Sequence, residues 1–482
     1  MVINSFLKDA LEHQRLQDYD SARTLFNKCI LLDSANYLPY FLIANLEKDL
    51  GNLDKAILNF EISIKYNANY INSYLNLSYL YLETNNYETA IEVLKKGISI
   101  NKNNIEIRIQ LSEIYVSVGS LKKATLTYNE IVQLDSKNFY AIYRLIQLNQ
   151  KDLDKKLKKE LKECEKNNKF INNQKIYANL ILAKYESNID RHNKEFQYLI
   201  EAHKLHYNQN NKNFTSNNKF IFNNLKNIHN YFDPNIEILH SNKIRENIRP
   251  IFIFGLPRSG STLIEKMIIK DNPRYSYGEE TKFFNLIADT IFFNKNENNL
   301  SSALEKVFIT YMKKFKSDEE ICFFTDKSLN NFFFLGWIKK LFPKAKLINC
   351  VRNPYIITTS ILRHNLHSLS WAHNLDDVIK YIDLYQEIIL KWKKNFDIEF
   401  YDIHYENLIN DFEFESKKLF DYCEINWTDD LINFNKNNNY ISRTASNIKV
   451  RSGLSKLEDE KHKLLANYIS HQINKPNWDK IN

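Results

Sequence analysis

Residues 250–269, "PIFIFGLPRSGSTLIEKMII", indicate how the second half of the chain folds. Its first five residues form an apolar run of strand length, and "STLIEKMII" continues as a helix. Between them, Gly255 and Gly260 let the backbone turn tightly and approach an anion. A strand, a glycine-rich loop and a helix in this order predict an anion-binding loop at a helix N-terminus. An ordinary strand-turn-helix connection is the alternative.

The loop departs from a nucleotide-binding P-loop at one position. The pattern G-x-x-x-x-G-K-[ST] places lysine where this chain has Ser261. Kinases and NTPases need that lysine, together with a carboxylate for magnesium. The nearest such carboxylate, Asp326 in "CFFTDKS", is followed directly by a lysine. A sulfuryl group carries a single charge and needs less neutralisation, so the loop favours a sulfonate donor. The expected donor contacts are Pro257, Arg258, Ser259, Gly260, Ser261 and Thr262.

Length and composition limit the class of protein. With 482 residues, of which 44% are hydrophobic and 26% charged, the chain can form two or three globular domains. The net charge of +8 is spread among acidic residues, which argues against nucleic acid as a partner. The five cysteines form no C-x-x-C pair, so neither disulfides nor a metal site is expected. No run of about 18 apolar residues occurs, so we expect no membrane insertion and a cytoplasmic location.

The first 138 residues form a repeat array. Small residues recur at intervals of 34 residues, and large ones follow one helical turn later: Ala22, Ala56, Ala90 and Ala124, then Phe26, Phe60, Leu94 and Tyr128. This spacing resembles the tetratricopeptide repeat, a pair of antiparallel helices, in four units over residues 1–138. The proline common near the end of each unit is absent here, which is expected to loosen the turns.

Further domain boundaries follow from drift in this period and from composition. Residues 139–230 keep helical spacing without the strict repeat, which indicates degenerate repeats or capping helices. A linker at 231–249 precedes a domain at 250–482. The array either binds a protein or peptide on its concave face or only extends the structure. Recurring aromatic residues favour binding: Tyr37, Tyr40, Tyr70 and Tyr74.

The second half alternates apolar runs with helical stretches. "PIFIF", "EICFF" and "KLINCV" are expected strands, and helices are expected at 261–270, 331–342 and 354–364. This alternation predicts an α/β fold with a parallel sheet flanked by helices. Ligands of such sheets bind beyond the carboxyl ends of the strands.

Five segments occur in an order that identifies a family. They are "GLPRSGST", "YSYGEETKFF", "TDKSLNNFFFLGWIKKLFPKAKLINCVRNPYIITTSIL", "IHYENLIND" and "RTASNIKVR". Together with the repeats, they resemble the tetratricopeptide-repeat-containing sulfotransferases and the related tyrosylprotein sulfotransferases. The resemblance implies an all-α solenoid followed in the chain by a P-loop-like sulfotransferase domain. It also implies 3′-phosphoadenosine 5′-phosphosulfate (PAPS) as donor, no metal, and a hydroxyl acceptor on protein tyrosine, a saccharide or a small molecule.

The resemblance also implies catalytic residues. Glu280 in "GEET" matches the general base of the tyrosylprotein enzymes, and its neighbour Glu279 is expected to be a structural partner. Lys327, Arg258 and Ser446 match groups that stabilise charge on the leaving oxygen. Both glutamates could instead be solvated loop acids, and Lys327 a surface lysine.

The donor's 3′-phosphate is expected to contact Arg352 and Ser360, which match the family's ligands for that group. Residues 353–354, Asn-Pro, are the expected N-cap and first residue of the following helix. Tyr405 and Arg451 match further nucleotide contacts. The tail after "RTASNIKVR" is shorter than in the family, which leaves the contact of Arg451 open. An arginine at a strand end can otherwise be a surface ion pair.

Three histidines give another candidate base: His364, His367 and His373, which either line the acceptor pocket or lie exposed in a loop.

Two other functions stay open, a repeat scaffold with a degenerate transferase domain and a P-loop kinase-like enzyme. The expected partner is an acceptor protein, peptide or glycan recruited by the repeats. The oligomeric state does not follow from the sequence.

Overall fold

The computed structural model describes residues 2–16, 18–148, 154–166, 171–238, 245–270, 272, 274–293, 300–315, 322–429, 431, 456–473, 475 and 478, with backbone alone at 456–461. The chain divides into two compact units, Met1–Asp152 and Leu153–Asn482. The division falls inside the region for which the sequence predicts degenerate repeats or capping helices.

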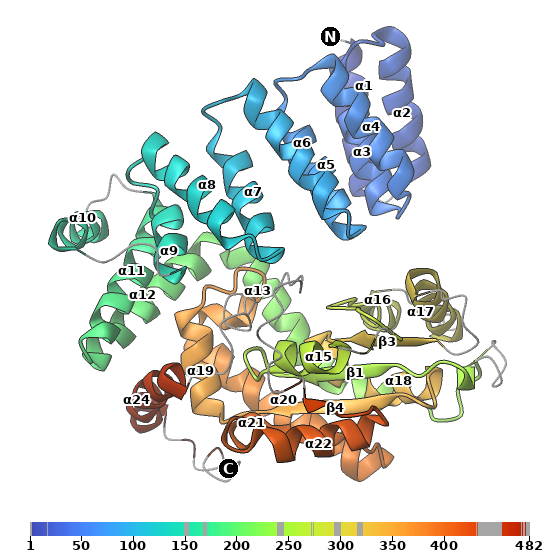
Figure 1. The fold of residues 1–482 in the computed structure, drawn as a ribbon. Helices are drawn as coiled ribbons and strands as arrows, with labels where there is room; N and C mark the ends of the chain where they lie inside the picture. Colours follow the sequence, from blue (N-terminus) through green and yellow to red (C-terminus); the bar gives the residue numbers. More distant parts are fainter. Residues whose placement is uncertain are drawn as a thin grey trace. The chain divides into compact units, whose positions relative to one another are not determined.

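The first unit is a row of helices in which each described helix packs against the next one (Figure 1). Its helices are α1 (Val2–Arg15), α2 (Tyr19–Leu32), α3 (Tyr37–Asp49), α4 (Leu53–Tyr66), α5 (Ile71–Glu83), α6 (Tyr87–Ile100), α7 (Ile105–Ser117), α8 (Leu121–Leu134) and α9 (Phe139–Gln147). All eight residues of the small-then-large register are fully buried. Phe60 of α4, for example, packs against Phe41 of α3 with ring centroids 5.7 Å apart. The predicted helical repeat is therefore confirmed.

Asparagines close the turns between successive repeats in place of proline. The Asn36 side chain accepts a hydrogen bond from the N–H of Leu38 at the start of α3. Asn104 and Asn138 cap α7 and α9 in the same way. An N-cap of this kind stabilises a helix by about 1 kcal/mol. The missing prolines are thus offset by capping at these turns.

The second unit contains a five-stranded parallel sheet with strand order β2-β3-β1-β4-β5. The strands are β1 (Ile251–Gly255), β2 (Tyr275–Ser276), β3 (Phe323–Asp326), β4 (Lys346–Val351) and β5 (Tyr401–His404). In the centre, β1 pairs with β4 from Ile251 opposite Lys346 to Gly255 opposite Cys350. Every residue of β1 is buried, as expected for a strand covered on both faces. The predicted parallel α/β fold is confirmed.

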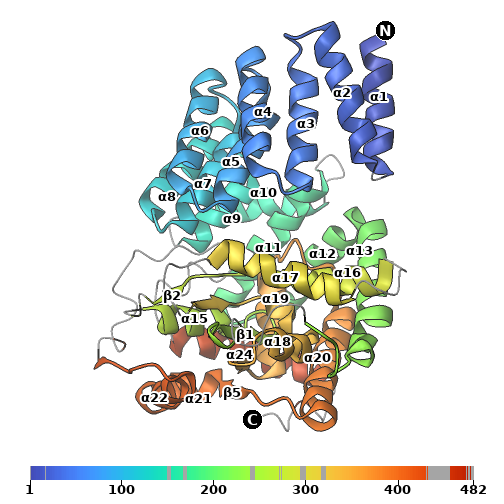
Figure 2. The same cartoon turned by 90° about the vertical axis from the view of Figure 1, so that its right-hand side faces the viewer.

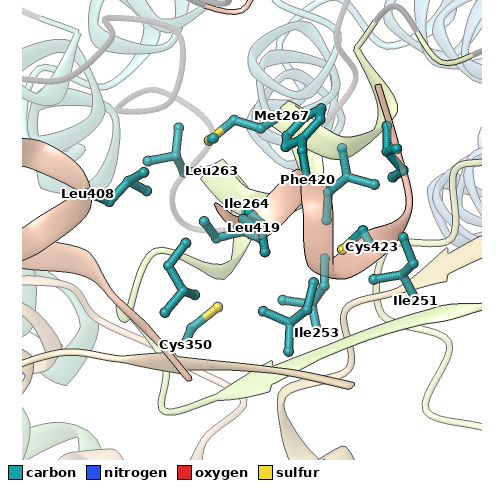
Figure 3. Close-up of a cluster of buried hydrophobic side chains, with 14 of the residues drawn as sticks. Ile251, Ile253, Leu263, Ile264, Met267, Cys350, Leu408, Leu419, Phe420 and Cys423 are labelled. Atoms are coloured by element: carbon teal, nitrogen blue, oxygen red, sulfur yellow. The ribbon is translucent and has the colours of Figure 1, made fainter. Parts of the chain in front are cut away.

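Both faces of β1 carry an apolar core. Figure 3 shows Ile251 and Ile253 on one face, packed with residues of α15 (Ser261–Ile269), α21 (Tyr405–Asn410) and α22 (Phe412–Cys423). Figure 2 shows α21 and α22 beside β5. Phe252 points to the other face, where its ring meets those of Phe284, Tyr311, Phe324 and Phe342. Alternation along β1 therefore fixes the position of the loop that follows it.

Helices complete the second unit. They are α10 (Lys155–Lys166), α11 (Asn172–Asn188), α12 (His192–Gln209), α13 (Asn211–Lys219), η1 (Phe220–Asn224), η2 (Leu225–Tyr231), α16 (Asn285–Phe293), α17 (Leu300–Phe315), η3 (Leu329–Phe333), α18 (Leu335–Leu341), α19 (Pro354–Arg363), η4 (Ser370–His373), α20 (Leu375–Phe396) and α24 (Lys456–Ile473). The helix α12 packs against α19 and α24. Arg363 of α19 lies 2.6 Å from the buried Glu195 of α12, so an ion pair joins a helix that precedes the sheet to the helix that follows β4. Among the described helices, none has the length and apolar character needed to cross a lipid bilayer.

Candidate active site

Four parallel strands bring polar residues to the same edge of the sheet. The strand β1 ends at Gly255 and leads into the anion-binding loop. Lys327 directly follows β3, Arg352 follows β4 and Tyr405 follows β5. Carboxyl ends of parallel strands meet at one edge, where ligands of such sheets bind. The structure therefore gathers residues from four separate sequence segments at this edge.

The loop backbone requires both of its glycines. Gly255 has φ +147° and Gly260 has φ +102°, which side chains rarely tolerate. A Cβ at Gly260 would lie 2.6 Å from Cδ2 of Tyr405, and one at Gly255 would lie 2.7 Å from the carbonyl oxygen of Cys350. Arg258 between them also has a positive φ, +73°. Such backbone strain in a non-glycine residue is typical of a functional loop.

The start of α15 offers donors for an anion. Gly260 is its N-cap and provides no side-chain cap, and the N-terminus of a helix favours negative charge. Ser261 and Thr262 open the helix and are buried. Ser259 is 2% exposed, and its hydroxyl has no hydrogen-bond partner among the residues that the structure describes. Pro257 lies buried in the same loop. These features fit an anionic ligand.

The Arg258 side chain reaches α19. Its Nε donates a hydrogen bond of 3.1 Å to Oγ of Ser360. Its Nη2 lies 3.2 Å from Nε2 of His364, whose Nδ1 lies 2.6 Å from the carbonyl oxygen of Ser360. Only a protonated Nδ1 can pair with a carbonyl, so Nε2 accepts from Arg258. In this arrangement His364 has no free basic nitrogen and is a poor general base.

Arg352 connects the loop with β5. Its Nη1 donates a hydrogen bond of 2.9 Å to the carbonyl oxygen of Arg258. Its guanidinium lies over the Tyr405 ring, 4.1 Å from the centroid. Asn353 caps α19 by accepting from two backbone N–H groups, and Pro354 is the first helical residue, as predicted. Arg258, Arg352, Ser360 and Tyr405 therefore form one connected group.

A second group of charges lies after β3. The Lys327 ammonium, 1% exposed, lies 3.1 Å from Oε1 of Glu280, which is 32% exposed. Burial lowers the pKa of Lys327, but the negative charges of Glu280 and Glu265 outweigh this effect, and the pKa stands above its ordinary value. Lys327 therefore carries its positive charge throughout the neutral range. It is neither a surface lysine nor an isolated one.

Glu279 has a different environment from Glu280. It is 5% exposed, has φ +53°, and accepts a hydrogen bond of 3.0 Å from the Tyr277 hydroxyl. Its carbonyl oxygen accepts from the Lys327 N–H at 2.7 Å. These contacts suit a structural partner, whereas the more exposed Glu280 can meet an acceptor.

The remaining two histidines differ, because His373 is buried whereas His367 is exposed in a turn after α19. His373 is 2% exposed, and its Nδ1 lies 3.0 Å from Nδ1 of His203 on α12. Burial lowers the pKa of His373 to about 2, with smaller contributions from neighbouring histidines. His367 pairs with the Tyr177 hydroxyl at 2.9 Å. Both histidines take part in packing between α11 or α12 and the segment before α20.

Two predicted contacts, Ser446 and Arg451, lie outside the described residues. The described part of the chain contains no cluster of three or more His, Cys, Asp or Glu side chains able to hold a metal ion. Asp326, the carboxylate considered for magnesium, is fully buried and accepts from the hydroxyls of Tyr311 and Thr281 and from the N–H of Ser328. It stabilises the turn after β3.

Sequence reasoning missed Glu265, which the structure places beneath this site. It lies on α15, is fully buried, and accepts a hydrogen bond of 2.8 Å from Oγ1 of Thr325 on β3. The available signal was a carboxylate inside the apolar run "STLIEKMII", because an ionisable residue on a buried helix needs partners.

The part of the chain that carries this site is similar to known proteins. Residues 250–429 match the sulfotransferase family. Residues 71–104 match the tetratricopeptide repeat. The sulfotransferase segment, residues 250–429, contains both groups of charges described above.

Three similar proteins illustrate these matches. An uncharacterized protein of Aquifex aeolicus is 23% identical over 90% of this chain and 58% of its own length. The omega-hydroxy-beta-dihydromenaquinone-9 sulfotransferase of Mycobacterium tuberculosis is 32% identical over 17% of this chain and 24% of its own length. The chain thus spans about half or less of these relatives. Among solved structures, the sulfotransferase domain of the Synechococcus PCC 7002 olefin synthase is 17% identical, with a TM-score of 0.33, over 49% of this chain and 98% of that domain.

Proposed function

We propose that the chain is a sulfotransferase that moves a sulfuryl group from PAPS to an acceptor hydroxyl. One observation carries the proposal: the Lys327–Glu280 pair and the group around Arg258 and Arg352 lie at the same sheet edge, within the sulfotransferase segment. The resemblance to tyrosylprotein sulfotransferases belongs to this proposal.

The residues at this edge fit the two anionic parts of PAPS. The glycine loop, the N-terminus of α15 and the buried hydroxyl of Ser259 suit the 5′-phosphosulfate. Arg352 and Ser360 lie beside the loop through Arg258 and suit the 3′-phosphate. Pro257, Gly260, Ser261, Thr262, Tyr405 and Arg451 complete the proposed donor contacts. No metal is required.

Each charged residue has a proposed task in the transfer. Glu280 takes the proton from the acceptor hydroxyl as that oxygen bonds to sulfur. The bond from sulfur to the bridging phosphate oxygen breaks, and negative charge grows on that oxygen. Lys327, Arg258 and Ser446 stabilise this charge. Glu279 keeps the loop in shape.

The acceptor carries the hydroxyl of a protein tyrosine, a saccharide or a small molecule. The name of the mycobacterial relative describes an omega-hydroxy compound, which supports a hydroxyl acceptor. Residues 1–138, with the helices at 139–230, recruit a protein, peptide or glycan, and a linker at 231–249 leads to the catalytic domain at 250–482.

The test uses PAPS labelled with sulfur-35 and one acceptor of each class, in the presence of EDTA. Labelled product must appear in step with adenosine 3′,5′-bisphosphate. Turnover of ATP that depends on magnesium would instead favour a kinase-like enzyme. Binding of the bisphosphate without transfer to any acceptor would favour a non-catalytic scaffold.

A further inference from the structure

A buried carboxylate links the helix of the anion-binding loop to the loop that carries the candidate base. Glu265 lies on α15, four residues after its first residue, and is fully buried. Its Oε1 accepts two hydrogen bonds, from the N–H of Glu279 at 3.2 Å and from Oγ1 of Thr325 at 2.8 Å. One oxygen atom of α15 therefore holds both the loop after β2 and the end of β3.

These bonds belong to a tight junction. Oγ1 of Thr325 accepts from the N–H of Gly278 at 3.2 Å, and the N–H of Lys327 donates to the carbonyl oxygen of Glu279 at 2.7 Å. A Cβ at Gly278 would lie 1.7 Å from the carbonyl oxygen of Thr325, so the loop touches β3 there. Residues 278–280 are thus fixed against β3 and α15 together.

The junction determines where Glu280 lies. Glu279 adopts φ +53°, a left-handed conformation that costs a non-glycine residue about 1 kcal/mol or more. The hydrogen bond from its N–H to Glu265 holds this conformation. The turn directs the next side chain, Glu280, to the Lys327 ammonium.

We propose that Glu265 is a positioning residue: it holds the turn at Glu279, so that Glu280 meets Lys327, and it couples the donor-binding helix to the base. The proposal rests on the proposed function for the role of Glu280. It adds to the proposed reaction one residue that contacts neither donor nor acceptor.

Glu265 also has an electrostatic role within the junction. Its Oε2 has no hydrogen-bond partner among the described residues. Burial raises its pKa to about 7, against the lowering effects of Lys327 and of the Thr325 hydrogen bond. The negative charges of Glu279 and Asp326 face it and raise the pKa further. Ionised Glu265 adds a second negative charge near Lys327 and Glu280, which makes Glu280 more basic, so we expect turnover to rise as Glu265 loses its proton.

The first test compares pH profiles of turnover. The wild-type chain is expected to show a rise in kcat centred near pH 7, and Glu265→Gln is expected to lose that rise. Glutamine keeps an oxygen that can accept both hydrogen bonds, so bisphosphate affinity should stay within about two-fold. Thr325→Val removes a hydrogen bond that favours ionised Glu265 and should move the rise to higher pH. Glu186→Gln, a buried carboxylate on α11, is the matched control and should leave the profile unchanged. A rise that persists unchanged in Glu265→Gln would overturn the electrostatic role.

The second test needs no activity and separates this inference from the proposed function. Amide hydrogen exchange of residues 278–280 is measured in the full chain without nucleotide. Glu265→Leu removes the acceptor for the Glu279 N–H and should speed exchange at these amides at least ten-fold, whereas Glu265→Gln should leave it near the wild-type rate. Faster exchange supports positioning even if PAPS proves not to be the donor. Equal exchange in wild type and Glu265→Leu would overturn the proposal.

Discussion

Lys327 and Glu280 form an ion pair of 3.1 Å in which the ammonium is buried and the carboxylate is about one-third exposed. The two charges thus face different surroundings. A buried ammonium is suited to stabilise charge inside a site, while a partly exposed carboxylate can meet an incoming hydroxyl. This asymmetry distinguishes the pair from an ordinary surface ion pair, which contributes about 0–1 kcal/mol to stability and has no directional role.

Replacement of the candidate base should affect the chemical step alone. Glu280→Gln keeps the size of the side chain but removes its basicity, so turnover should fall about 10²- to 10⁴-fold with bisphosphate affinity nearly unchanged. The control is Glu279→Gln, which alters a buried residue bonded to Tyr277 and should cost much less turnover. Turnover of both variants is measured on one acceptor. An inactive Glu279→Gln beside an active Glu280→Gln would shift the base by one residue.

The proposed contact of Arg352 with the 3′-phosphate can be tested by comparing the dissociation constants of two nucleotides. Arg352→Ala removes two things, the hydrogen bond to the carbonyl oxygen of Arg258 and the proposed contact with the 3′-phosphate. The first loss weakens adenosine 5′-phosphate and adenosine 3′,5′-bisphosphate alike. The second weakens only the bisphosphate, by about 1.5–3 kcal/mol. Titration of both nucleotides gives the ratio of dissociation constants, and Arg274→Ala, at an exposed arginine that lies over Phe323, is the control. An unchanged ratio would remove Arg352 from the 3′-phosphate site.

Glu265 should make stability depend on pH. Its pKa rises from 4.5 in the unfolded chain to about 7 in the folded protein, so between these values the folded state binds more protons. Stability therefore falls as pH rises through this window and is unaffected by Glu265 below it. The cost approaches about 3 kcal/mol above pH 7, because one pKa unit corresponds to about 1.4 kcal/mol. Urea unfolding at pH 4.5 and 7.5 should show this loss in the wild-type chain but not in Glu265→Gln. Parallel losses in both proteins would contradict it.

The repeat unit should fold by itself up to residue 152. Glu195 and His203 of α12 bond to Arg363 and to the carbonyl oxygen of Leu362 on α19, so a fragment ending at residue 230 would lack these partners. We expect a fragment of residues 1–152 to give a strong helical circular dichroism spectrum and to unfold cooperatively. A fragment of residues 1–230 should show the same single unfolding transition, because its additional helices lack their partners. Removal of residues 1–152 should preserve bisphosphate binding but abolish transfer to a large acceptor. Transfer that survives this deletion would reduce the repeats to an extension.

Local sequence patterns predicted much of this fold because they depend on residues that lie close together in the sequence. Ala56 and Phe60 lie one turn apart on α4, and Asn353 and Pro354 form the start of α19. The strand, loop and helix around Gly260 follow from adjacent residues in the same way. Such features depend on periodicity and backbone preference, which a single segment contains.

Contacts between distant segments could not be predicted in this way. His373 meets His203 across 170 residues, and that burial turned an expected loop histidine into a packed one. The bond from Glu279 to Glu265 depends on how α15 lies on β3. Nothing in the residues around "GEET" reveals that the first glutamate is bonded through its N–H to Glu265 while the second pairs with Lys327. The different environments of Glu279 and Glu280 could therefore be recognised only from the tertiary structure.

In the proposed reaction, this edge of the sheet binds a 3′-phosphorylated adenine nucleotide without metal. Isothermal titration calorimetry of the full chain with adenosine 3′,5′-bisphosphate and with ATP, each with EDTA and then with magnesium, tests it most directly. We predict tight binding of the bisphosphate in EDTA, at least ten-fold tighter than that of ATP and insensitive to magnesium. Tighter binding of ATP that requires magnesium, or no binding of the bisphosphate, would show that this edge is not a PAPS site.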